Sequence, residues 1–240
     1  MIQLVIATRN AHKATEIRTI LGEAVHGLTL NDFPGAPITI EDAPTFAGNA
    51  TKKAVELARW LGTIRPSPLT PGPSPHYVLA DDSGLEVDAL GGAPGVFSAR
   101  FAASHGTAAA TAEASASNSS DGENNAKLLR LLKDIPSDQR TARFRCVLAL
   151  TPVIAEAAVG ASPVCYADEL EWQTELFEGV CEGAIAFGPS GRGGFGYDPL
   201  FVPTGYQQTF AELGEDVKNR LSHRARALAR LRAKLETHPP

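Results

Sequence analysis

The chain has 240 residues, of which 43% are hydrophobic and 20% charged, and its formal net charge is −5. This length suits one large domain or two small lobes with a proper core. The acidic balance argues against nucleic acid as a partner, because a duplex-binding surface needs an excess of Lys and Arg over a whole face. No apolar run reaches the roughly 20 residues that span a bilayer, so we expect no membrane association.

The spacing of the cysteines and the composition of the first residues bear on the cellular compartment in which the protein acts. Cys146, Cys165 and Cys181 are far apart and odd in number, which fits neither a disulfide framework nor a zinc site. Residues 1–7 carry no basic segment before their apolar run, which favours a first strand over a signal peptide. We therefore expect a cytoplasmic protein, since thiols stay reduced there.

The first half of the chain alternates between predicted strands and helices. Residues 4–7 are typical of a buried strand, and apolar residues recur at helical spacing over 14–21. A second helix is expected over residues 46–61, with Gly62 ending it. The proline-rich segment 63–76 can be neither helix nor central strand and is expected to be an extended loop.

The second half is less regular. The pattern predicts an insertion over residues 103–122, a leucine-rich helix over 127–133 and a strand over 144–150. A second insertion over 153–171, a strand over 179–187 and one long helix over 217–235 follow. Strands and helices mix without strict alternation. We therefore expect an α/β fold over residues 1–240, a single domain with a mixed curved central sheet flanked by helices and two lobes with a cleft between them.

Two adjacent carboxylates, Asp81 and Asp82, follow the apolar strand residues 77–80, and Ser83-Gly84 predicts a turn directly after them. Like charges a few ångströms apart raise each other's pKa unless a cation lies nearby. A bound divalent metal such as Mg²⁺, or an acid/base role, would explain the pair. The alternative is that these residues merely cap a turn or a helix.

The segment from Thr8 to Lys13 joins a strand end to a helix start. Backbone N–H groups at a helix N-terminus favour phosphate oxygens, and Lys13 adds a positive charge there. The glycines and the Gly-Lys-Ser/Thr signature of a P-loop are missing. The segment therefore indicates either a phosphate-binding turn or an ordinary Asn-capped helix.

A further acid and lysine pattern surrounds the start of the second helix. Asn49 and Lys53 are four residues apart and share a helix face, while Lys52 or Lys53 is expected to be simple solvated charge. Glu41 precedes this helix; in isolation such a residue is more often an exposed loop acid than a metal ligand.

Glycines surround two aromatic residues between Gly191 and Pro199. Phe195 and Tyr197 offer faces on which a base could stack, and Asp198 supplies acceptors. The alternative is a tight glycine hairpin with its aromatic residues in the core.

The segment from Lys218 to Arg224 gathers cations at what we expect to be the start of the C-terminal helix. The helix dipole is already positive there, so an anion or an electron-rich carbonyl nearby would explain the arrangement. Arg226, Arg230 and Arg232 fit a solvated face.

Taken together, these motifs resemble the inosine triphosphate pyrophosphatase family, whose members act on ITP, dITP and XTP. The resemblance covers nearly the whole chain and rests on residues 7–13, 45–54, 80–85, 87–100, 142–146, 194–199 and 222–224. It implies an Mg²⁺-dependent enzyme that cleaves a nucleoside triphosphate into monophosphate and pyrophosphate, and a homodimer.

The resemblance also implies roles for matching positions. Glu41 and Asp82 would hold Mg²⁺, with Asp82 also the proton acceptor, although the sequence alone could not choose Asp82 over Asp81. The substrate contacts would be Thr8, Arg9, Asn10, Ala11, His12, Lys13, Lys53, Ser83, Phe195, Gly196, Tyr197, Asp198, Lys218, His223 and Arg224. Of these, Lys218, His223 and Arg224 would donate to the carbonyl at purine position 6.

The chain departs from the family pattern in two respects, and two alternative functions remain. Arg9 stands where the best-known members have glycine, and the segments 63–76, 103–122 and 153–171 look longer than in a minimal member. Maf-type pyrophosphatases, which act on modified pyrimidine triphosphates, are similar enzymes. A catalytically silent nucleotide-binding module is the other alternative, against which Glu41, Asp81 and Asp82 argue.

Overall fold

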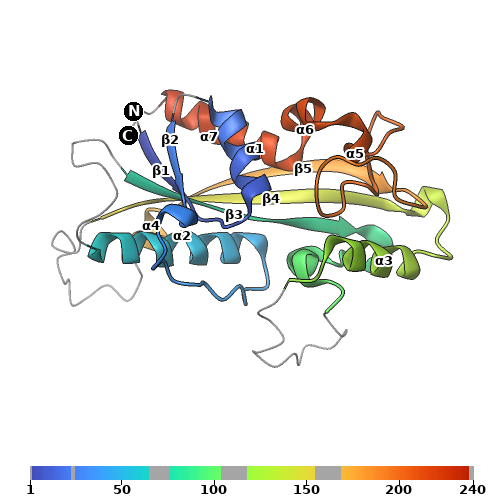
Figure 1. Ribbon diagram of the computed structural model, residues 1–240, viewed down its shortest axis with the longest axis horizontal. Coiled ribbons are helices and arrows are strands. Elements are labelled where there is room, and N and C mark those ends of the chain that lie inside the picture. Colours follow the sequence, from blue (N-terminus) through green and yellow to red (C-terminus); the bar gives the residue numbers. More distant parts are fainter. Residues whose placement is uncertain (1, 23–24, 65–75, 104–117, 155–168, 238–240) are drawn as a thin grey trace. The chain divides into compact units, whose positions relative to one another are not determined.

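The computed structural model describes residues 2–22, 25–64, 76–103, 118–154 and 169–237. Its strands are β1 (Ile2–Ile6), β2 (Val25–Thr29), β3 (His76–Val87), β4 (Thr141–Pro152), β5 (Glu175–Ile185) and β6 (Phe201–Pro203). Its α-helices are α1 (Ala11–Leu21), α2 (Phe46–Thr63), α3 (Asp121–Leu131), α4 (Glu169–Trp172), α5 (Phe210–Leu213), α6 (Glu215–Leu221) and α7 (His223–Thr237). Figure 1 shows these elements along the chain.

The strands form one open, six-stranded sheet in the order β2-β1-β3-β4-β5-β6. Parallel and antiparallel pairings both occur, since β1 runs parallel to β2 and β3 whereas β5 and β6 are antiparallel. This mixed sheet with flanking helices confirms the predicted α/β class. The chain divides into a first unit (residues 1–82, 147–178 and 227–240) and a second unit (residues 83–146 and 179–226), each described by itself below. The predicted cleft stays a prediction.

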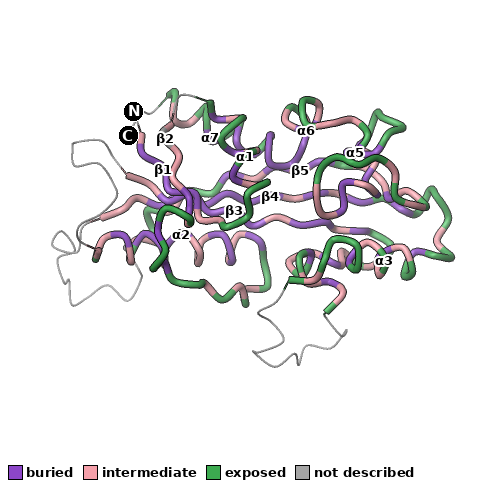
Figure 2. The backbone as a smooth tube through the Cα atoms, viewed as in Figure 1, coloured by how far each residue is buried: buried purple, intermediate pink, exposed green. Residues whose placement is uncertain are grey.

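The first unit is built around β1. Leu4, Val5 and Ile6 are each at most 1% exposed, so both faces of the strand are covered. Such continuous burial is typical of parallel strands between helices. Within this unit, α2 covers one face of the strands, and α1 with the C-terminal part of α7 covers the other (Figures 1 and 2).

Helix α2 confirms the helix predicted from the apolar stripe. The Thr45 side chain accepts a hydrogen bond from the Gly48 N–H and thereby caps the helix start. The buried residues of α2 include Ala50, Ala54 and Leu57, which lie at helical spacing on its inner side. The helix continues through Gly62 to Thr63, so Gly62 does not end it.

The core of the second unit is rich in aromatic rings. Phe144 on β4 contacts Phe201, with ring centroids 4.6 Å apart, and Phe201 stacks on Phe210 at 5.3 Å. Beside this core the guanidinium of Arg140, itself 2% exposed, donates to the carbonyls of Ile185, Leu132 and Ala186. Arg140 thus ties the end of α3 to the end of β5.

Strand β3 corrects the turn predicted at Ser83-Gly84. The strand runs on to Val87, because Leu85 and Val87 are fully buried and the backbone stays extended to bring them into the core. Strand β2 was not predicted; its sequence, Val-His-Gly-Leu-Thr, has a glycine at its centre and becomes a strand by pairing with β1.

Two predicted helices differ in their bounds. Helix α3 begins at Asp121, before the predicted residue 127, because Ser120 and Glu123 form a capping box. The predicted C-terminal helix is two helices, α6 and α7, separated by Ser222, whose ψ of 162° is extended. The Ser222 hydroxyl accepts the Ala225 N–H and so caps α7 as a new helix.

Several predictions fall partly or wholly on residues that the structure leaves out. The insertions near 63–76, 103–122 and 153–171 lie mostly outside the described residues, as does Cys165. Cys146 and Cys181 are buried free thiols. None of the helices in the described ranges has the length and apolarity to cross a membrane.

Arg140 provides a test of the second unit. Replacing it in Arg140→Met leaves three carbonyls, two of them in buried contacts, without a charged donor, so we expect the free energy of unfolding to fall by about 3 kcal/mol in urea denaturation. The matched control is Arg130→Met, at an exposed position of α3, which should change it by less than ~0.5 kcal/mol. Equal midpoints for the two variants would contradict the role of Arg140.

Candidate functional site

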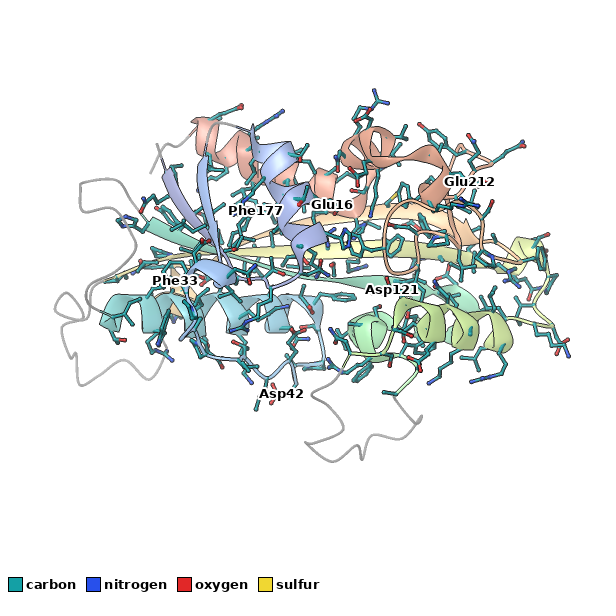
Figure 3. All side chains as sticks on the ribbon, in the orientation of Figure 1. Glu16, Phe33, Asp42, Asp121, Phe177 and Glu212 are labelled. Atoms are coloured by element: carbon teal, nitrogen blue, oxygen red, sulfur yellow. The ribbon has the colours of Figure 1, made fainter. Side chains whose placement is uncertain are left out.

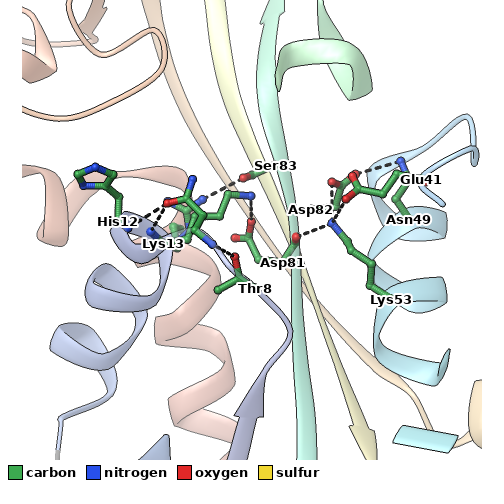
Figure 4. Close-up of polar contacts among 11 residues, drawn as sticks. Thr8, His12, Lys13, Glu41, Asn49, Lys53, Asp81, Asp82 and Ser83 are labelled. Atoms are coloured by element: carbon green, nitrogen blue, oxygen red, sulfur yellow. Dashed lines mark hydrogen bonds and ion pairs between the residues drawn. The ribbon is translucent and has the colours of Figure 1, made fainter. Parts of the chain in front are cut away.

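Asp81 and Asp82 point to opposite faces of β3. Successive side chains on a strand alternate between faces, and the strand does not end at this pair. The carboxylate of Asp81 lies towards Lys13 at the start of α1, whereas that of Asp82 lies towards Asn49 and Lys53 on α2 (Figure 4). The two acids therefore belong to two different polar clusters of the first unit.

The Asp82 cluster is buried and carries both signs of charge. Asp82 Oδ1 lies 3.1 Å from Lys53 Nζ, and Asp82 Oδ2 accepts a hydrogen bond from Asn49 Nδ2 at 3.2 Å. Lys53 Nζ also lies 3.4 Å from Glu41 Oε1 and donates to the backbone carbonyl of Asp81. One ammonium thus bridges two carboxylates from different segments.

Burial and charge shift the pKa values of this pair. Burial raises the pKa of Asp82 above its ordinary value, and this effect outweighs the attraction of Lys53 and Lys13. Burial by itself lowers the pKa of Lys53, but the facing carboxylates of Asp82, Glu41 and Asp81 more than offset it, so that pKa is raised. Lys53 keeps its charge, and Asp82 binds a proton more readily than an exposed aspartate.

Lys52 and Lys53 separate as the sequence predicted. Lys52 pairs with Asp42 at 2.7 Å on the surface, whereas Lys53 points into the acidic cluster. Only Lys53 lies in the site.

The Asp81 cluster includes the turn from Thr8 to Lys13. Lys13 Nζ contacts Asp81 Oδ1 at 2.5 Å, and Asn10 Oδ1 accepts the backbone N–H groups of His12 and Lys13. The turn is therefore an Asn-capped helix start whose lysine is oriented by Asp81. Arg9, in this turn, donates through Nη2 to the carbonyl of Ala36 at 3.2 Å.

The residues present fit a magnesium ion. In the part of the chain that the structure describes, no group of three or more His, Cys, Asp or Glu side chains could enclose a metal. Glu41 and Asp82 supply two carboxylates, and both face the same ammonium, that of Lys53, at 3.4 Å and 3.1 Å. Mg²⁺ is commonly held by one or two carboxylates, with waters and substrate phosphates completing its octahedron.

The second unit contains the glycine-rich segment with Phe195. Gly194 has a φ of +73°, and a Cβ on it would lie 2.2 Å from Asp198 Oδ2, so only glycine fits. That carboxylate oxygen in turn accepts the Phe195 N–H at 2.8 Å. On the other side of the segment, the N–H of Gly196 donates to Asp121 at the start of α3 (Figure 3).

Cations gather around the Phe195 ring. Lys218 Nζ lies 4.2 Å from the ring centroid and donates to Asp198 Oδ2 at 2.6 Å, with both side chains almost fully buried. Arg224 Cζ lies 6.0 Å from the same centroid, and its Nη2 donates to Ser83 Oγ at 2.9 Å. The structure thus brings Ser83, Phe195, Asp198, Lys218 and Arg224 into one cluster, in which Asp198, Lys218 and Arg224 are buried.

Tyr197 and His223 are both buried in the second unit. The Tyr197 ring belongs to the core, and its hydroxyl donates to the Ser98 carbonyl, so the expectation of an open stacking face is wrong for this residue. The His223 ring is buried and stacks on Phe144 at 4.8 Å. Its own helix α7 starts with His223 and Arg224.

The helix-dipole argument needs correction for Lys218 and Arg220, whereas His223 and Arg224 do lie in the first turn of α7. Lys218 and Arg220 lie in the last turn of α6, which begins with Glu215 and Asp216. Cations in the last turn and acids in the first are the favourable arrangement. Their charge is therefore explained locally and requires no anion.

Asn49, and Asp121 with Asn125, contact residues of the two clusters but were not among the predicted site residues. Asn49 was noted only for sharing a face with Lys53, yet that spacing was the signal for its contact with Asp82. Asp121 and Asn125 bond the N–H and the carbonyl of Gly196, a contact that nothing in the sequence indicates.

The comparisons with known proteins identify the family. Residues 4–234 match the Ham1 family. The chain is 42% identical over 228 residues to the dITP/XTP pyrophosphatase of Desulforamulus reducens, covering 95% of this chain and 92% of that protein. It is 42% identical over 229 residues to the dITP/XTP pyrophosphatase of Rhodopirellula baltica, covering 95% and 90%. The chain belongs to the Ham1 family, which confirms the resemblance found in its motifs.

Solved structures agree with this assignment. A HAM1 protein from Coxiella burnetii matches with a TM-score of 0.73 and 33% identity, covering 99% of this chain and 100% of that one. The Ham1 protein of Staphylococcus aureus matches with a TM-score of 0.71 and 31% identity, covering 98% of each chain.

The Lys218–Asp198 pair provides a stability test. Asp198→Asn leaves the Lys218 ammonium buried without its counter-charge, so we expect a loss of about 3–5 kcal/mol in the free energy of unfolding. Lys52→Met, which breaks the exposed pair with Asp42, is the control and should leave the urea midpoint unchanged. A wild-type midpoint for Asp198→Asn would show that the buried pair does not hold the segment.

Proposed function

We propose that this protein hydrolyses the non-standard purine nucleoside triphosphates ITP, dITP and XTP to nucleoside monophosphate and pyrophosphate, removing them from the nucleotide pool. One observation supports the proposal most. A buried carboxylate, Asp82, is held between Asn49 and Lys53 in a chain 42% identical to two proteins named dITP/XTP pyrophosphatase.

The first unit supplies the groups that the phosphates and the metal require. Lys13 and Lys53 would neutralise charge on the triphosphate, and Glu41 with Asp82 would hold Mg²⁺. Bound Mg²⁺ would supply stabilisation of the charge that develops on the leaving pyrophosphate. Asp82, whose pKa burial raises, would accept the proton of the attacking water. Asp81 faces Lys13 and would orient that lysine.

The second unit supplies the groups that select the base. Lys218, His223 and Arg224 offer N–H donors beside Phe195 or Phe144. Inosine and xanthosine present a carbonyl acceptor at purine position 6, whereas adenosine presents an amine donor. With adenosine bound, the protein donors would face the adenine amine and stay unpaired, and such a mismatch can discriminate between the two kinds of substrate by ~10⁴-fold. Ser83, which bonds Arg224, follows Asp82 directly in the chain.

The proposal extends to cofactor, assembly and compartment. We propose a single two-lobed domain that uses Mg²⁺, forms a homodimer and acts in the cytoplasm without binding nucleic acid or membrane. The net charge of −5 supports the exclusion of nucleic acid.

A substrate panel tests the reaction. ITP, dITP, XTP, ATP, GTP and a methylated UTP are each incubated with Mg²⁺ or with EDTA, and pyrophosphate and orthophosphate are measured separately. We expect Mg²⁺-dependent pyrophosphate from ITP, dITP and XTP, with ATP slower by ~10⁴-fold in kcat/KM. Orthophosphate as the product, a preference for the methylated UTP, or nucleotide binding without turnover would contradict the proposal.

The two aspartates provide the sharpest mutational test. Asp82→Asn removes the proton acceptor, so kcat for ITP should fall by ~10²–10⁴-fold while nucleotide binding, followed by calorimetry, stays measurable. Asp81→Asn is the matched neighbour; it loosens Lys13 and should raise KM more than it lowers kcat. Full activity in Asp82→Asn, or an equal loss of kcat in both variants, would refute the assigned roles.

A further inference from the structure

Asn49, on α2, donates a hydrogen bond to the carboxylate of Asp82, and it is 0% exposed. Its amide is used from both ends. The Nδ2 group donates to Asp82 Oδ2 at 3.2 Å, and Oδ1 accepts the backbone N–H of Ala43 at 3.0 Å. Ala43 lies two residues after Glu41, so one amide connects Asp82 to the segment that carries Glu41.

The orientation of this amide is fixed by its partners. A backbone N–H can only donate, so it requires the amide oxygen, and the carboxylate of Asp82 can only accept while it is charged, so it requires the amide nitrogen. Rotating the amide by half a turn would break both hydrogen bonds. Asn49 is also held by its own helix, because its N–H donates to the Thr45 carbonyl in the first turn of α2.

The two carboxylate oxygens of Asp82 have different partners, and only Oδ1 has a cation beside it. Asp82 Oδ2 is taken by Asn49, and Oδ1 faces Lys53, the ammonium that also faces Glu41. Groups that bond the far side of a metal ligand fix its rotamer, and their loss typically weakens metal affinity by 10–100-fold.

We infer that Asn49 is a positioning residue for the metal site: its amide sets the rotamer of Asp82 and ties it to the segment that presents Glu41. This inference rests on the proposed function, because it takes Glu41 and Asp82 as the magnesium ligands. In this role Asn49 acts through Asp82 and is not itself a ligand of the metal.

Asn124 provides a matched control. It is the fourth residue of α3 as Asn49 is the fourth of α2, and it is 3% exposed. Its Oδ1 also accepts a backbone N–H from the preceding segment, that of Ala102, but its Nδ2 donates to the Ala99 carbonyl instead of to a carboxylate. Asn49→Ala and Asn124→Ala therefore remove similar hydrogen bonds, and only the first touches Asp82.

The experiment titrates the full chain with Mn²⁺ in the absence of nucleotide and follows free Mn²⁺ by electron paramagnetic resonance. We expect Asn49→Ala to weaken Mn²⁺ binding at least ~10-fold, Asn124→Ala to keep the wild-type affinity within ~2-fold, and Asp82→Asn to abolish binding. The Mg²⁺ concentration for half-maximal pyrophosphate release from ITP should rise by the same factor in Asn49→Ala. Urea unfolding compares the stability of the two alanine variants.

The possible failures are distinguishable. Wild-type Mn²⁺ affinity in Asn49→Ala, with binding lost in Asp82→Asn, overturns the inference and leaves the proposed metal site intact. An equal loss in Asn49→Ala and Asn124→Ala overturns it too, since the effect would then be general. No Mn²⁺ binding by the wild type, or none lost in Asp82→Asn, overturns the metal site and the inference together. If Asn49→Ala does not fold, Asn49→Ser, too short to reach both partners, is measured with the same outcomes.

Discussion

The burial of Asp82 beside Lys53 is the interaction on which the account depends. A carboxylate taken out of water is unstable unless a cation or hydrogen-bond donors compensate it. Here Lys53 provides the charge and Asn49 provides the donor, while Glu41 shares the same lysine. An arrangement with this desolvation penalty contributes little to stability, which is why we interpret it as a site for chemistry.

The second unit also contains a buried aspartate–lysine pair, but its carboxylate has a structural use. Asp198 and Lys218 form a buried pair, but the carboxylate is also used internally, since it accepts the N–H of Phe195. The pair thus shapes the glycine-rich segment and places an ammonium over the Phe195 ring. One buried pair therefore gathers charged groups beside Glu41, and the other places an ammonium beside an aromatic ring.

The sequence predicted the elements whose pattern is local. The apolar stripe of α2 and the alternation in β4 gave both elements to within a few residues. The sequence-based prediction was wrong where burial outweighs local preference. Ser83-Gly84 is typical of a turn, yet β3 continues to Val87 because Leu85 and Val87 are buried in the core. That continuation places Asp81 and Asp82 on opposite faces of β3. The break between α6 and α7 at Ser222 was not predicted, because the spacing of apolar residues continues across it.

The most direct test of the account is a crystal structure of the protein soaked with Mn²⁺, with the ion located by its anomalous scattering. The account predicts a peak in direct coordination by Asp82 and Glu41, on the face of β3 from which Asp82 points towards Lys53 of α2. A peak on the opposite face, coordinated by Asp81 beside Lys13, or no peak at either aspartate, would contradict it.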